Sequence, residues 1–226
     1  WLALTLGLIS YLLIRLRLLF VSFLLFIILC AVSLYWLNRN DNYLRFSNDY
    51  KTTIFHPDFK EHLLATYEMK DMSTAERFYR WVAGVRMIKD SWKTGFGPTT
   101  FYQNYKSYTE PAFKTWVSKN EEHSTVHNYY LLMIIEQGVM GLFLFILLLG
   151  TSFWYSQYLY SKTGDFKIKI IITCIASLLV MISTIIFLSD MIETDKIGSI
   201  FYLAISSLIL TDYKTEEKQS DLSTNI

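Results

Sequence analysis

Residues 18–37, LLFVSFLLFIILCAVSLYWL, form an unbroken stretch of twenty uncharged positions, and this stretch decides the fold. At about 1.5 Å per residue, a helix of that length covers the roughly 30 Å hydrocarbon core of a bilayer. The sequence therefore predicts a membrane-spanning helix at this point of the chain.

Further apolar runs lie on both sides of this helix. Residues 1–14 are equally apolar but fewer, and three more runs follow at about 129–156, 168–189 and 197–211. Because the first run opens directly at Trp1, we expect the chain to be the C-terminal part of a longer membrane protein. The pattern predicts an all-α polytopic membrane protein with about five transmembrane helices.

The predicted organisation has four parts. Two transmembrane helices occupy residues 1–37, a large loop with short amphipathic helices occupies 38–126, three transmembrane helices occupy 127–211, and a polar tail occupies 212–226. The loop holds 13 of the 21 basic residues and 11 of the 20 acidic residues. Two cysteines are too few for a disulfide scaffold. With a net charge of +1, the chain also lacks the strongly basic surface that nucleic-acid binding needs.

Basic residues in short loops predict the orientation of the spans. One predicted membrane face carries most of them, namely Arg15, Arg17, Lys162, Lys167, Lys169, Lys214 and Lys218. The opposite face has only Lys196 in its short loop. The first face, with the tail, is therefore expected to be cytoplasmic, and the large loop is expected outside.

Local patterns predict four helices in the large loop, over residues 57–69, from 73 to just before Lys93, and over 101–108 and 111–117. The second opens with Ser73-Thr74-Ala75-Glu76, which matches a capping box. Apolar residues then recur at helical spacing, at Phe78, Trp81, Val82, Val85 and Ile88. We expect Arg77 at the edge of this stripe, and Arg80 and Arg86 further from it.

These arginines have two interpretations. They are either solvated or bound to lipid headgroups, or they form an anion site, because guanidinium groups match phosphate oxygens in a bidentate fork. His127 is likewise either a histidine at a helix start or a base, because neutral imidazole can accept a proton from a hydroxyl. His123 and His127 have i,i+4 spacing but lack the glutamate of a zinc motif, so no metal and no cofactor is predicted.

Acidic residues supply further candidates. Glu136 lies in an apolar run beside Gln137-Gly138, where a helix break or close helix contact is expected, and its role is either structural or chemical. Asp190, Glu193 and Asp195 are either turn residues or the acidic side of an external active site.

The motifs combine into a recognisable order. Arg77 to Asp90 is followed by Gly95-Phe96-Gly97-Pro98, then His127-Asn128, and then Glu136 to Leu142. With its membrane placement, this order resembles the O-antigen ligase and polymerase family, most strongly over about residues 73–150. The resemblance implies a multi-pass protein of the bacterial inner membrane with its active site at the periplasmic face.

The resemblance also implies an activity. The family is expected to be a metal-independent glycosyltransferase that takes its glycan from an undecaprenyl-diphosphate carrier. The acceptor is a sugar hydroxyl of lipid A-core in a ligase, or another lipid-linked glycan in a polymerase. A membrane transporter and a non-catalytic scaffold are less favoured alternatives, since Glu136 is the sole acidic residue within the predicted spans.

Residue roles follow from the same resemblance. Arg77 matches the arginine that holds the diphosphate, and His127 matches the histidine that activates the acceptor or contacts substrate. Further candidate substrate-binding residues are Arg80, Arg86, Asn128, Gly95 and Gly97, the first two chosen for their charge. A second family arginine is expected before Trp1, and a late acidic residue of the family corresponds to Asp190 or Asp195.

Overall fold

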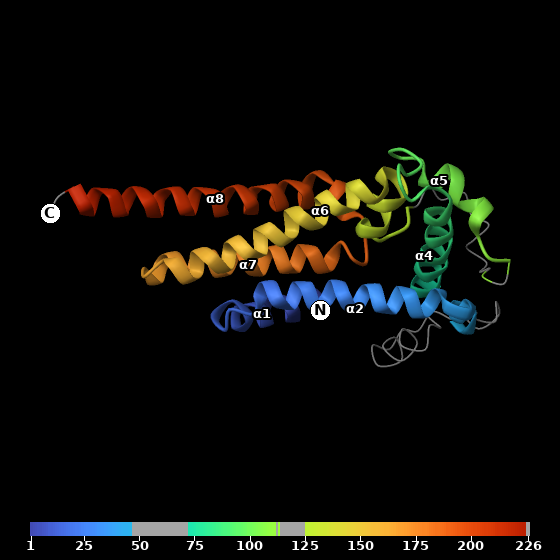
Figure 1. Cartoon of the computed structure of the whole chain (residues 1–226), viewed down its shortest axis with the longest axis horizontal. Helices are drawn as coiled ribbons and strands as arrows, with labels where there is room; N and C mark the ends of the chain where they lie inside the picture. Colours follow the sequence, from blue (N-terminus) through green and yellow to red (C-terminus); the bar gives the residue numbers. More distant parts are fainter. Residues whose placement is uncertain (47–71, 112, 114–124, 225–226) are drawn as a thin grey trace. The chain divides into compact units, whose positions relative to one another are not determined.

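The computed structural model describes residues 1–46, 72–111, 113 and 125–224, and every regular element in these ranges is a helix (Figure 1). Three of these helices are long and apolar enough to cross a membrane, namely α2 (Leu19–Asn38), α6 (Tyr129–Lys162) and α7 (Phe166–Ile185). The first helix, α1 (Leu2–Arg15), is apolar but has 14 residues. The fold class is therefore that of an all-α polytopic membrane protein, as predicted, with three of the five expected spans meeting both criteria.

The chain divides into two compact units. Unit 1 comprises residues 1–30 and 144–226, and unit 2 comprises residues 31–143. Helices α2 and α6 each contribute to both units. The described parts of the large predicted loop thus belong to unit 2, together with the end of α2 and the start of α6.

Unit 1 is a bundle in which α7 packs against α1 and against α8 (Asp195–Thr224). The Ser10 and Ser177 hydroxyls lie 2.8 Å apart, and a Cβ at Gly7 would lie 2.5 Å from Met181 Cγ. Because Ser10 pairs with Ser177 while the earlier Gly7 pairs with the later Met181, α1 and α7 run antiparallel. Small residues at these positions let the two helices approach closely.

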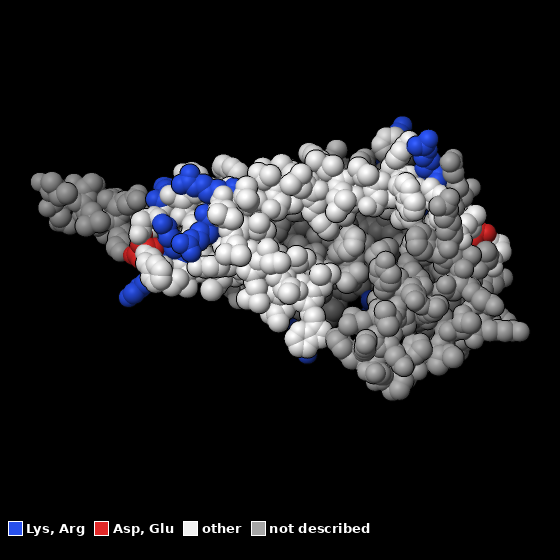
Figure 2. Space-filling view, turned by 90° about the horizontal axis from the view of Figure 1, so that it is seen from below, with Lys and Arg blue, Asp and Glu red and all other residues white. Residues whose placement is uncertain are grey.

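The antiparallel packing brings basic turns to one end of unit 1. Arg15 at the end of α1 lies toward the start of α7, where Lys167 and Lys169 follow Lys162 of α6. Figure 2 shows one large group of Lys and Arg side chains, with a smaller group lying apart from it. Two of the basic turns used to predict the orientation therefore share one end of the bundle.

The polar tail is helical where the structure describes it. Helix α8 continues through Thr224 instead of ending near residue 211. Tyr155 Oη donates a hydrogen bond to Asp212, and Lys162 Nζ lies 3.6 Å from Asp212 Oδ1. These contacts tie the first turn of the predicted tail to α6.

Unit 2 is built around α4 (Met72–Ser91). This helix begins one residue before Ser73, so Ser73 lies in the first turn and is not the predicted cap, and it ends before Lys93 as predicted. The predicted 101–108 segment forms α5 (Phe101–Asn104) and a 3-10 turn, η2 (Tyr105–Tyr108). The predicted helices at 57–69 and 111–117 lie outside the described residues, apart from Pro111 and Phe113.

Two apolar clusters hold these elements together. The first contains Met87, Phe101, Tyr105, Val126, Leu132 and Ile135. The second contains Ala75, Phe78, Tyr79, Val82 and Phe113, with Leu37 and Tyr43 packed against it. Helix α4 also crosses α6 closely, because a Cβ at Gly84 would lie 2.8 Å from Ile135 Cδ1. Helix α4 is therefore covered on more than one side.

Candidate functional site

A break in α6 organises one side of unit 2. Gly138 has φ 70° and ψ −172°, which interrupts the helical hydrogen bonds and confirms the predicted break. The freed Ile135 carbonyl accepts a hydrogen bond from Phe96 N (2.8 Å), and the Glu136 carbonyl accepts one from Gly97 N (2.9 Å). Val139 N donates in return to the Trp92 carbonyl (2.8 Å). The loop after α4 is thus joined to the broken helix through three backbone hydrogen bonds.

Glycine is required at both sides of this junction. A Cβ at Gly95, whose φ is +70°, would lie 2.4 Å from the Glu136 carbonyl atoms. A Cβ at Gly138 would lie 2.3 Å from the Lys93 carbonyl oxygen. Gly97 has φ +104°, which also favours glycine. The backbone junction accounts for these glycines structurally, and substrate binding by Gly95 and Gly97 stays a prediction.

The Glu136 side chain strengthens the same junction. Its carboxylate accepts hydrogen bonds from Thr99 N (2.9 Å) and Phe101 N (3.2 Å), and the residue is 7% exposed. Both donors belong to the segment that enters α5. These contacts support the structural interpretation of Glu136, because its charge is matched by backbone N–H groups.

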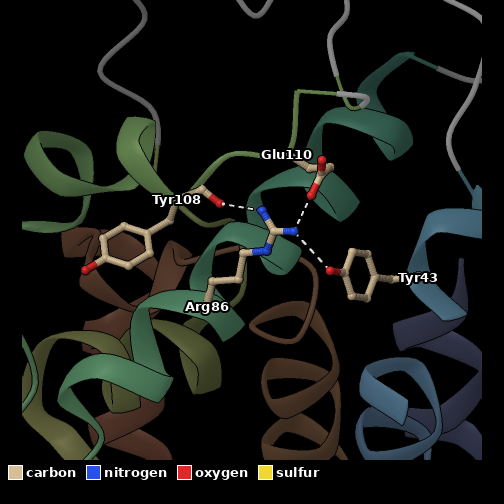
Figure 3. Close-up of polar contacts among 4 residues, drawn as sticks. All are labelled: Tyr43, Arg86, Tyr108 and Glu110. Carbon is tan, nitrogen blue, oxygen red and sulfur yellow. Dashed lines mark hydrogen bonds and ion pairs between the residues drawn. The ribbon is translucent and has the colours of Figure 1, made fainter. Parts of the chain in front are cut away.

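Arg86 forms a polar cluster inside unit 2 (Figure 3). Its Nη2 donates hydrogen bonds to the Glu110 carboxylate and to Tyr43 Oη (3.0 Å), and its Nη1 donates to the Tyr108 carbonyl (3.4 Å). Burial lowers the pKa of Arg86, but the hydrogen bonds to Tyr43 and Glu110 and their charge outweigh it, so the pKa is raised. The guanidinium therefore stays charged and joins α4 to the 3-10 helix η1 (Arg39–Phe46) and to the segment after η2.

The cluster was not predicted from sequence. Tyr43 and Glu110 are 43 and 24 residues from Arg86, and no short-range pattern links them. Substrate binding by Arg86 stays a prediction, and three donors of its side chain already have partners within the fold.

Arg80 lies on a buried face of α4. It is only 9% exposed, although it lies off the predicted apolar stripe. The reason is that Ala83 and Met87, at helical spacing from Arg80, are fully buried on a second apolar face of α4. Its Nη1 donates to the Thr125 carbonyl (3.2 Å), and its Nε lies 3.9 Å from Glu76 Oε2.

Arg77, one turn before Arg80, has a different environment. The residue is half-buried, and it makes no hydrogen bond or ion pair within the described part of the chain. The two arginines are therefore distinguished by their surroundings. Arg80 binds its own fold, whereas Arg77 has no such partner among the described residues.

His127 follows the segment that Arg80 contacts. His127 has φ +53°, in the left-handed region, and its N–H donates to Thr125 Oγ1 (3.3 Å). Val126 is fully buried, and Asn128 Oδ1 accepts a hydrogen bond from Leu131 N (3.0 Å), which makes Asn128 the N-cap of α6. The sequence therefore predicted the position of His127 before α6 correctly but missed the supporting role of Thr125. Substrate binding by Asn128 stays a prediction.

An apolar groove runs along the other side of α4. Its lining combines the end of α2 with η1 and α4, namely Leu34, Leu37, Tyr43, Phe78, Trp81, Val82, Val85, Arg86 and Lys89. Most of these lining side chains are apolar, and Lys89 among them is exposed.

The remaining candidates lie elsewhere. Asp190 precedes the 3-10 turn η4 (Met191–Glu193), where its carbonyl accepts a hydrogen bond from Glu193 N (3.1 Å), and Asp195 is exposed at the start of α8. Both belong to unit 1, whereas Arg77 and His127 belong to unit 2. His123 lies outside the described residues. Among the residues that are described, no group of three or more His, Cys, Asp or Glu side chains is arranged to hold a metal ion.

These features define a polytopic membrane protein whose arginine and histidine candidates gather in one helical unit. The family model described as O-Antigen ligase matches residues 1–146, more than half of the chain, and the chain therefore belongs to the O-antigen ligase family. No curated protein and no solved structure matches the chain. The match contains all of unit 2 and ends within α6, so Asp190 and Asp195 fall outside it.

Membership in this family defines the general function. It supports a ligase- or polymerase-type enzyme of surface polysaccharide assembly that acts on a lipid-linked glycan and an acceptor. The resemblance inferred from the motifs is thereby confirmed.

Proposed function

We propose that the protein is a membrane glycosyltransferase that moves a glycan from an undecaprenyl-diphosphate carrier to a sugar hydroxyl. One observation carries the proposal: the hydrogen bond from Arg80 Nη1 to the Thr125 carbonyl (3.2 Å). Arg77 is three residues before this contact on α4, and His127 is two residues after it. A cation and a potential base thus lie beside one junction in unit 2, within the family match.

In the proposed reaction, the acceptor hydroxyl oxygen attacks the anomeric carbon of the donor glycan. A glycosidic C–O bond forms while the bond from that carbon to the diphosphate oxygen breaks, with inversion at the carbon. His127 takes the hydroxyl proton, and the leaving undecaprenyl diphosphate keeps the electron pair. The Arg77 guanidinium stabilises the charge that develops on the diphosphate, a role that does not itself call for a metal ion.

The membrane setting supports a lipid-linked donor. The groove beside α4 is largely apolar and begins at the last turns of α2, one of the three candidate spans. Basic turns lie at one end of α2 and α6, and residues 38–126 join the other ends of these helices. By the positive-inside rule this arrangement favours cytoplasmic turns and a reaction at the periplasmic face of the inner membrane.

The proposal is tested by restoring surface polysaccharide to a deletion strain with the full-length protein. Arg77→Ala and His127→Asn are each expected to prevent complementation at normal membrane levels. Asn is chosen because it tolerates a left-handed backbone but cannot accept the proton. The matched control is Lys106→Ala, which removes an exposed cation from η2 in the same unit, away from the groove. Complementation by both site variants would rule the proposal out.

The same strain separates the two activities of the family. Loss of all attached polymer in the deletion strain identifies a ligase with a lipid A-core acceptor. Retention of single attached repeat units identifies a polymerase, for which the acceptor is another lipid-linked glycan.

A further inference from the structure

Arg80 is a buried cation with an unusual set of partners. Its Nη1 hydrogen-bonds a backbone carbonyl, its Nε faces Glu76 at 3.9 Å, and the Nε–H lacks a hydrogen-bond acceptor in the described structure. Burying a guanidinium is costly unless its charge is compensated and its donors are used. The Glu76 carboxylate and the Thr125 carbonyl provide that compensation, so Arg80 faces its own fold and not an anionic ligand.

The carbonyl that Arg80 binds begins the segment that presents His127. Thr125 Oγ1 accepts the His127 N–H, Val126 is fully buried in the core, and Asn128 caps α6. The segment is therefore anchored immediately before and immediately after His127. Arg80 provides an anchor from another helix.

The backbone at His127 needs such anchoring. Its φ of +53° is uncommon for a residue with a Cβ, and such conformations persist only where the surroundings enforce them. Freeing the Thr125 carbonyl removes one of these restraints. The imidazole then samples other positions, while the half-buried Arg77 one turn earlier on α4 keeps its own surroundings.

We propose that Arg80 is the positioning residue of His127, acting through the Thr125 carbonyl, and that it does not bind the donor diphosphate. This inference rests on the proposed function, in which His127 accepts the proton. It separates two neighbouring arginines of α4 into different roles. Loss of Arg80 lowers kcat, whereas loss of Arg77 weakens stabilisation of the diphosphate.

The test is a double-mutant cycle on glycan transfer by the purified full-length protein. Arg80→Met is expected to lower kcat roughly 10- to 100-fold, because a catalytic group displaced by about 1 Å loses up to that factor. The KM for the lipid-linked donor is expected to change less than about twofold, since Arg80 makes no contact with the donor in this proposal. In a His127→Asn background, Arg80→Met is expected to cause no further loss, because its effect passes through the missing imidazole.

The outcomes are separable. An equal fold-loss from Arg80→Met in both backgrounds, or a raised KM with unchanged kcat, would overturn the positioning role. Full activity of His127→Asn would instead refute the proposed function. If Arg80→Met does not fold, Arg80→Lys replaces it, because Lys keeps the buried charge beside Glu76 while losing the planar fork. The same cycle then predicts a smaller loss that again vanishes without His127.

Discussion

Replacing Gly138 by alanine tests the backbone junction on which unit 2 depends. Gly138 has φ 70° and ψ −172°, a conformation essentially confined to glycine, which costs other residues about 1–3 kcal/mol. The added Cβ would lie 2.3 Å from the Lys93 carbonyl oxygen, and relieving such an overlap typically costs about 1–3 kcal/mol more. We therefore expect Gly138→Ala to lower the free energy of unfolding by roughly 2–6 kcal/mol.

Thermal unfolding of the full-length protein in a mild detergent, followed by tryptophan fluorescence, measures this effect. At about 2–4 °C per kcal/mol for a domain of this size, the expected fall in Tm is roughly 4–24 °C. Gly164→Ala is the matched control, because a Cβ at Gly164 meets no atom within 4 Å and its φ is not positive. Equal Tm values for the two variants would contradict the description of the junction.

Two further predictions concern buried polar groups. Glu136→Ala leaves Thr99 N and Phe101 N without their acceptor and is expected to lower the free energy of unfolding by about 2–5 kcal/mol in the same assay. Glu136→Gln keeps one acceptor oxygen and is expected to cost less. An unchanged free energy of unfolding for Glu136→Ala would disprove the role of its carboxylate in holding the segment that enters α5. In a double-mutant cycle of Arg86→Met with Glu110→Gln, we expect a coupling of about 0.5–2 kcal/mol, because both side chains are partly exposed and screened. Strict additivity in that cycle would mean that the ion pair contributes nothing to stability.

Several features of the fold could be predicted because their causes are local. An uncharged run of twenty residues predicted the span that became α2, and the glycines and proline after Ser91 predicted the end of α4. Gly138 within an apolar run predicted the break in α6. Each of these depends on residues that are neighbours in sequence.

The environment of the site depended on contacts between distant segments. Arg80 was expected off the apolar stripe, since nothing in the sequence of α4 shows that Ala83 and Met87 are covered on a second face. The Arg86 partners were equally hidden, because the packing of η2 against α4 brings the distant Glu110 to Arg86. Residue type thus predicted charged candidates, and the tertiary fold determined which of them already have internal partners.

The central claim is that Arg77 and His127 of unit 2 act together in glycan transfer. It is tested most directly by the initial rate at which the purified full-length protein transfers glycan from the undecaprenyl-diphosphate-linked donor. We predict that His127→Asn lowers kcat by about 10²–10⁴-fold and that Arg77→Lys lowers kcat/KM by about 10²–10³-fold, whereas Lys106→Ala leaves both unchanged. Rates for both site variants that match the Lys106→Ala control would contradict the account.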